Sequence, residues 1–212
     1  YKTPNSGITS RTSSNTRTEL GQKAHWIPET GGKLTGTLKV QHVSTSGDAR
    51  VAASYAVVVG QIHSDEGHEN EPIKIFYKKF PGHTKGSVFW NYEINTEGGN
   101  AKRWDYSSAV TFTKNLLKSE FTKTIPEQVK TLYASIGRDG LERENAYAGE
   151  IQYFKQGAYN QTNGKSPEDN IVWSTGADIY DGDIEKQYAN GSYTEVWFKE
   201  ATVGPGTPPI EE

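Results

Sequence analysis

The sequence has no cysteine and no methionine in 212 residues, and its formal net charge is only -3. Without cysteine the chain cannot form a disulfide framework, a zinc ribbon or a thiol nucleophile. No run of Lys and Arg is longer than two residues, so we expect no binding to nucleic acid, which usually requires a basic patch. No apolar stretch approaches the roughly 18 residues of a membrane span, so we expect no membrane insertion.

The chain begins with Tyr1 and not with methionine. A chain that has been processed, trimmed or cut from a longer one begins in this way, and removal of a secretion signal is one such processing step. We therefore expect a secreted, extracellular protein, with the periplasm as the alternative compartment.

Aromatic residues and glycine are frequent, although hydrophobic residues make up only 33% of the chain. The 5 Trp, 12 Tyr, 7 Phe and 22 Gly are typical of a half-exposed antiparallel sheet with many turns. Turn sequences separate the strand-like stretches, which predicts an all-β sandwich or barrel in one domain, 1–203, followed by a Pro/Gly-rich tail, 204–212. The predicted strands are 34–43, 50–63, 72–80, 87–95, 104–113, 131–136, 150–159 and 193–203, and short helical turns are expected within 114–120, 126–131 and 174–186.

Three segments, two of them within the strands just named, carry polar or ionisable side chains at alternate positions of a strand-like pattern. Because successive side chains of a strand point to opposite faces, each set shares one face of a sheet. A cation, an amide, an imidazole and a phenol can then line one groove, which suits the removal of a proton next to a carboxylate. The sets are Arg17 with Glu19, Gln61 with His63, and Tyr153 with Lys155 and Tyr159.

Each segment alone also has an ordinary structural explanation. An Arg-x-Glu pair on a strand is usually a solvated ion pair. A histidine at a strand end is more often packed or solvated than catalytic, and tyrosine is common in sheets. The presence of all three segments in this order is much less common than any one of them alone, and it points to a shared function.

In this order the segments resemble the signature of polysaccharide lyase family 7, the alginate lyases. The family pattern is Arg-(Ser/Thr)-Glu-(Leu/Val)-Arg, then Gln-(Ile/Val)-His, then Tyr-Phe-Lys-x-Gly-x-Tyr-x-Gln. The chain matches the second at 61–63 and the third at 153–161 completely. It departs from the first only at Gly21, where the family has arginine.

The resemblance implies a jelly roll of two antiparallel sheets with a concave cleft for an acidic polysaccharide. It further implies β-elimination at a 4-linked uronate by a monomer without metal or cofactor, and Ile62 implies tolerance of guluronate. Lys23, the next position on the face of Gly21, is expected to replace the missing cation. The implied catalytic residues are Arg17, Gln61, His63 and Tyr159, and the implied substrate-binding residues are Glu19, Lys23, Tyr153, Lys155 and Gln161.

Three other functions compete with alginate cleavage. A lyase for another polyuronate would need the same chemistry. A non-catalytic carbohydrate-binding module could use the aromatic residues as sugar platforms, but it would not need the four catalytic side chains together. A retaining glycosidase needs two carboxylates about 5 Å apart, and the alternating acids Asp181, Asp183 and Glu185 lie in what we interpret as a surface loop.

Overall fold

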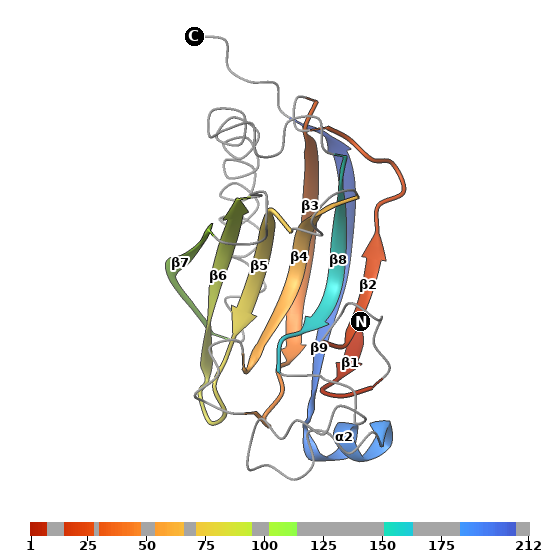
Figure 1. The fold of residues 1–212 in the computed structure, drawn as a ribbon. Helices are drawn as coiled ribbons and strands as arrows, with labels where there is room; N and C mark the ends of the chain where they lie inside the picture. The colour runs from red at the N-terminus through yellow and green to blue at the C-terminus, as the bar shows by residue number, and fades with distance from the viewer. Residues whose placement is uncertain are drawn as a thin grey trace.

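The computed structural model of the protein describes residues 1–7, 15–27, 30–47, 54–65, 71–94, 102–113, 151–162 and 183–206. The elements in these ranges are almost all strands, as the sequence predicts (Figure 1). Their bounds are β1 Lys2–Pro4, β2 Arg17–Gly21, β3 Gly32–His42, β4 Ala56–Ser64, β5 Ile73–Lys78, β6 Lys85–Ile94, β7 Lys102–Thr113, β8 Gln152–Asn160, α2 Ile184–Asn190 and β9 Tyr193–Pro205.

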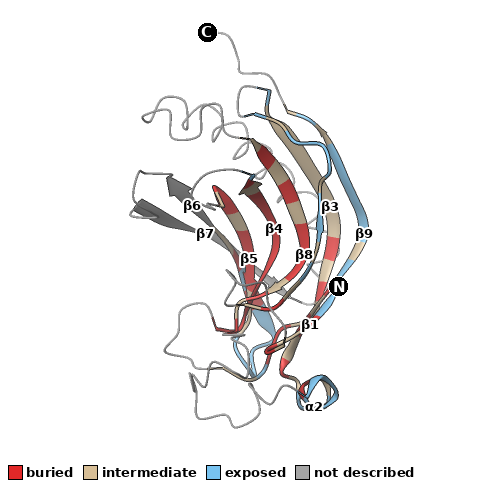
Figure 2. Ribbon diagram, turned by 45° about the vertical axis from the view of Figure 1, so that its right-hand side comes forward, coloured by how far each residue is buried: buried red, intermediate tan, exposed pale blue. Residues whose placement is uncertain are grey.

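The strands form two antiparallel sheets. One has the order β1-β9-β3 and the other the order β2-β8-β4-β5-β6-β7. Figure 2 shows β3 and β9 as one curved layer beside the layer that contains β4, β5 and β8. The predicted all-β jelly roll of two antiparallel sheets is therefore confirmed.

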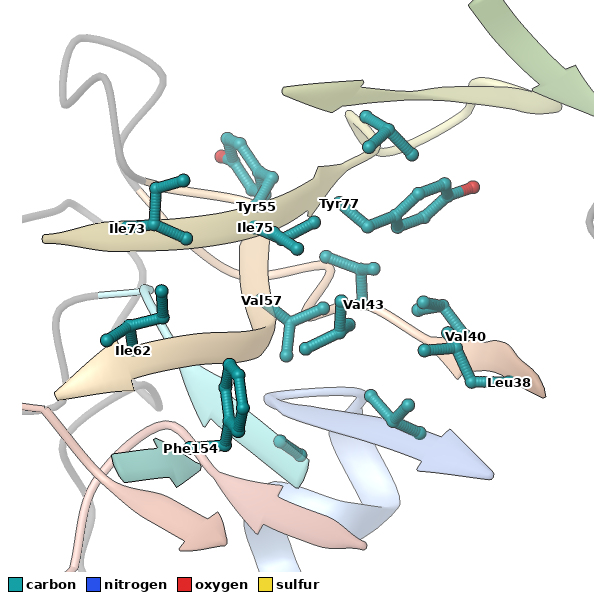
Figure 3. Close-up of a cluster of buried hydrophobic side chains, with 14 residues drawn as sticks. Leu38, Val40, Val43, Tyr55, Val57, Ile62, Ile73, Ile75, Tyr77 and Phe154 are labelled. Atoms are coloured by element: carbon teal, nitrogen blue, oxygen red, sulfur yellow. The ribbon is translucent and has the colours of Figure 1, made fainter. Parts of the chain in front are cut away.

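The hydrophobic core lies between the two sheets (Figure 3). Leu38 and Val40 of β3 and Val196 of β9 belong to the same buried cluster as Val57 of β4 and Phe154 of β8. Along β8, buried residues alternate with half-buried ones. One face of the strand packs into the core, and the half-buried face is called the open face below. Each fully buried Val or Phe side chain contributes about 1.5–3 kcal/mol by leaving water.

A register shift between Val58 and Gly60 decides which residues of β4 face the core. Val57 and Val59 both belong to the core cluster, so strict alternation would also direct Gln61 and His63 into the core. The extra residue reverses the alternation: Ile62 joins the core instead, and Gln61 lies opposite Lys155. A smaller cluster on this open face contains Val58 and is contacted by Tyr159.

The short helix α2 has clear sequence signals at both ends. Asp183 caps its N-terminus by accepting a hydrogen bond from the Lys186 N–H at 3.0 Å. Gly191 ends the helix with a φ of 85°. The expected helical turn within 174–186 is thus a helix that continues to Asn190, and Asp183 has a structural role that weakens the glycosidase alternative.

The other differences from the prediction concern the bounds of elements. β1 was not predicted, β4 begins only at Ala56 within the predicted stretch 50–63, and β9 runs to Pro205, two residues beyond the predicted strand end at 203. The strand predicted for 131–136 and the helical turns predicted for 114–120 and 126–131 lie outside the described residues. Within the described ranges, no helix is long and apolar enough to span a membrane.

We predict that Gly157→Ala destabilises the protein by about 3 kcal/mol, through backbone strain and overpacking. Gly157 has a φ of 150° where β8 pairs with β2. An added Cβ would collide with the Thr18 carbonyl oxygen and would lie 2.9 Å from the Glu19 Cα. Urea unfolding measures the loss of free energy.

Gly82→Ala is the matched control for this prediction. Gly82 also has a positive φ, of 77°, but nothing lies within 4 Å of an added Cβ. We expect a loss of about 1 kcal/mol from the left-handed backbone alone. Equal losses for the two variants would contradict the proposed close approach of β2 to β8.

Candidate active site

Strand pairing brings the three polar segments together on the open face of the six-stranded sheet. β8 pairs with β2 on one side and with β4 on the other. Arg17 lies opposite Tyr159, Gln61 opposite Lys155, and His63 opposite Tyr153. The predicted sharing of one face by residues from distant parts of the chain is therefore confirmed, whereas their roles in a reaction stay predictions.

Arg17 and Glu19 of the edge strand β2 contact residues of β8 and β4 on this face. The guanidinium carbon of Arg17 lies 4.4 Å from the centre of the Tyr159 ring, a cation–π distance. A guanidinium nitrogen lies 3.8 Å from Oε2 of Glu19, and the Gln61 amide donates to Oε1 of Glu19 at 2.8 Å. The Glu19 side chain is only 6% exposed. Burial raises the pKa of Glu19, while Arg17 and Lys155 oppose this shift.

The surroundings of His63 favour a neutral imidazole. Its Nδ1 lies 2.6 Å from the carbonyl oxygen of Ser64. Because a carbonyl only accepts, we assign the proton to Nδ1, which leaves Nε2 as the basic nitrogen. Burial lowers the pKa of His63, and the nearby Lys155 charge lowers it further. The Ser64 carbonyl and the Glu71 carboxylate act in the opposite direction.

Tyr153 and Lys155 occupy the part of the face next to His63. The Tyr153 ring centre lies 5.2 Å from that of His63, and the Lys155 ammonium lies 5.4 Å from the Tyr153 ring. Burial lowers the pKa of Lys155, and the Glu19 carboxylate opposes that shift. Burial raises the pKa of Tyr153, with Asp65 as the next cause. A cation, an imidazole and a phenol thus lie within one small area.

The structure adds charged residues that the sequence analysis missed. Lys74 of β5 lies opposite Gln61, and its ammonium is 2.9 Å from the Glu71 carboxylate. Both side chains are only 14% exposed. Alternation along β5, with Ile73 and Ile75 in the core, is the sequence signal that could have placed Lys74 on the open face.

Two predicted substrate-binding residues lie at the margins of the site. Lys23 is exposed in the turn after β2, so its predicted place on the face of that strand is wrong, because the strand ends at Gly21. Gln161 directly follows β8, and its backbone N–H donates to the Ala56 carbonyl at 3.0 Å. Contact of either side chain with substrate stays a prediction.

This geometry defines a class of site. A guanidinium, an imidazole whose pKa is lowered and a phenol share one face of an antiparallel sandwich. Such a set can neutralise a carboxylate and move protons beside it. Among the residues that the structure describes, no group of three or more His, Asp or Glu could hold a metal ion.

Comparisons with known proteins agree with this class. The family model described as alginate lyase matches residues 1–205. A curated alginate lyase from Klebsiella pneumoniae is 30% identical over 169 residues, which are 66% of this chain and 52% of that protein. The chain thus spans about half the length of this relative.

Solved structures give the same result. The crystal structure of an exolytic alginate lyase of polysaccharide lyase family 7 from Zobellia galactanivorans is 70% identical, with a TM-score of 0.73 and coverage of 99% of this chain and 84% of that one. The structure of the alginate lyase from Klebsiella pneumoniae is 19% identical, with a TM-score of 0.52 and coverage of 98% and 81%, and supports the fold alone. The chain belongs to the alginate lyases of polysaccharide lyase family 7.

We predict that His63 titrates below the usual value of 6.5 and that two substitutions move its pKa in opposite directions. Lys155→Met removes a cation that disfavours protonation, so the pKa should rise. Glu71→Gln removes an anion that favours protonation, so the pKa should fall. NMR titration of the His63 ring measures all three values, and shifts of the same sign in both variants would contradict this electrostatic account.

Proposed function

We propose that the protein cleaves alginate by β-elimination at a 4-linked uronate and releases 4,5-unsaturated oligosaccharides. The observation that carries the proposal is the register that joins Arg17, Tyr159 and His63 on one face in a member of the alginate lyase family. The chain has a negative net charge, but Arg17, Lys74 and Lys155 give this face the cations that a polyanion needs.

The first task of the site is to neutralise the substrate carboxylate. The C5 proton is poorly acidic beside a charged carboxylate, because its removal would build a second negative charge on the same group. Arg17 supplies a fixed cation with several N–H groups, and the Gln61 amide keeps one N–H beyond the one bonded to Glu19. Gln61 is fully buried, so its contact with substrate requires the covering side chains to move on binding.

The proton transfers then fall to His63 and Tyr159. For guluronate, where the C5 proton and O4 lie on opposite sides of the ring, Nε2 of His63 takes the C5 proton. The electron pair of the broken C5–H bond forms the C4=C5 double bond, the C4–O4 bond breaks, and the Tyr159 hydroxyl protonates O4. For mannuronate, where both lie on one side, Tyr159 serves as base and acid.

The proposal also covers the mode of cleavage, the substrate preference, the oligomeric state and the location of the enzyme. Exolytic cleavage is supported by the 70% identity to a structure described as exolytic. Ile62 supports tolerance of guluronate through the family pattern. We further propose a secreted monomer that acts outside the cell and inserts into no membrane.

Ultraviolet absorbance of the conjugated product tests the reaction directly. Wild-type protein with poly-guluronate or poly-mannuronate and a chelator should give rising absorbance. Tyr159→Phe should lower the rate by about 100-fold or more, because it removes a general acid. No absorbance with either polymer would overturn the alginate proposal, and activity on another polyuronate or binding without cleavage would identify the alternatives.

Product size during the reaction tests the exolytic mode. We expect small unsaturated sugars from the earliest times while the viscosity of long alginate falls slowly, because cleavage at chain ends hardly shortens the polymer. Size-exclusion chromatography and viscometry on the same samples measure both quantities. A rapid fall in viscosity before small sugars accumulate would identify endolytic cleavage instead.

A further inference from the structure

We propose that His25 is a further substrate-binding residue, whose Nε2 accepts a hydrogen bond from a hydroxyl group of the sugar unit bound beside Tyr153. The inference rests on the proposed function, since it names an additional contact at the same site. No motif in the sequence singles out His25, and its place follows from the path of the backbone after β2.

The backbone leaves the edge of β8 for only three residues after Gln22. The Gln22 N–H donates to the Phe154 carbonyl at 2.8 Å, and Trp26 pairs with Gln152 in both directions at 3.0 and 2.7 Å. Residues 23–25 therefore form a turn opposite Tyr153. The Gln22 side chain fixes this turn, because its Oε1 accepts from the Phe154 N–H and from the Trp26 indole, each at 3.2 Å.

Two contacts hold the His25 ring at the site. It stacks on Tyr153 with a centroid distance of 4.8 Å and an interplanar angle of 19°. Its Nδ1 lies 3.1 Å from Oδ2 of Asp65, whose own N–H donates to the Ile151 carbonyl at 2.8 Å. The same Tyr153 ring lies 5.2 Å from that of His63. His25 is thus tied to the end of the site where the proposed base stands.

Gly21 places no side chain next to Tyr153. A Cβ at Gly21 would lie 3.9 Å from the Tyr153 ring, so a side chain there would compete for the space beside Tyr153. The His25 side chain itself is 33% exposed, so substrate can reach it.

The Asp65 contact determines which chemistry His25 offers. A carboxylate only accepts, so Nδ1 of His25 donates to it. In the tautomer that carries its proton on Nδ1, Nε2 is an acceptor, and sugar hydroxyl groups are the donors that a polysaccharide supplies in number. Asp65 acts here as a positioning residue, since it orients the ring without touching the sugar.

Steady-state kinetics on alginate oligosaccharides tests the proposal. We expect His25→Ala to raise KM about fivefold to tenfold, the loss of one hydrogen bond, while kcat stays within about twofold. His25→Gln keeps a neutral acceptor and should restore most of the affinity, whereas His25→Lys should not. His83→Ala, in the exposed turn between β5 and β6, is the matched control and should change neither constant.

Several outcomes would overturn the contact. If His25→Ala left both KM and the thermal midpoint unchanged, His25 would not contact the substrate. If the variant lowered kcat alone, His25 would be a positioning residue for Tyr153. If His25→Lys restored the affinity and His25→Gln did not, the group that binds residue 25 would be a sugar carboxylate and not a hydroxyl. If the wild type forms no unsaturated product, the proposed function fails, and calorimetric titration with a uronate trisaccharide still decides whether His25→Ala weakens binding.

Discussion

The site depends on the backbone pairing of β8 with two strands at once. β2 and β4 are separated by more than thirty residues of sequence, and their common neighbour β8 fixes the register of both. Side-chain contacts such as that of Arg17 with Tyr159 follow from this pairing. Gly157 is a condition for it, because no Cβ can be accommodated where β8 passes Thr18 and Glu19. The glycine of the third motif therefore maintains the distance between strands on which the proposed chemistry relies.

The charges of the open face are balanced locally. Lys74 is paired with Glu71, and Glu19 is shared between Arg17 and the Gln61 amide. Partial burial strengthens such interactions, since less water screens them. The same burial works against each isolated charge, as the opposite pKa shifts of Glu19 and Lys155 indicate. A polyanion therefore meets cations that are already oriented by carboxylates, and not a broad positive surface.

Most of the fold could be predicted from composition and periodicity. Strands such as β5, β8 and β9 carry clear alternation or turn signals at their ends, and the structure has them within a few residues of the predicted bounds. β1 has only three residues, too few to show a period of two. The reversal of alternation in β4 was not visible either, since Val57, Val58 and Val59 are all apolar and pattern alone cannot locate the extra residue.

The sequence was sufficient to predict which residues share the candidate site, but not what surrounds them. Alternation and motif order suffice for residues inside strands, because a strand fixes where successive side chains point. The position of Lys23 was predicted by continuing the same alternation, but the strand ends at Gly21. The path of the turn is fixed by hydrogen bonds between Gln22 and a residue some 130 positions away. The turn brings His25, and not Lys23, onto Tyr153, because backbone partners distant in sequence decide which residue of a loop returns to the sheet.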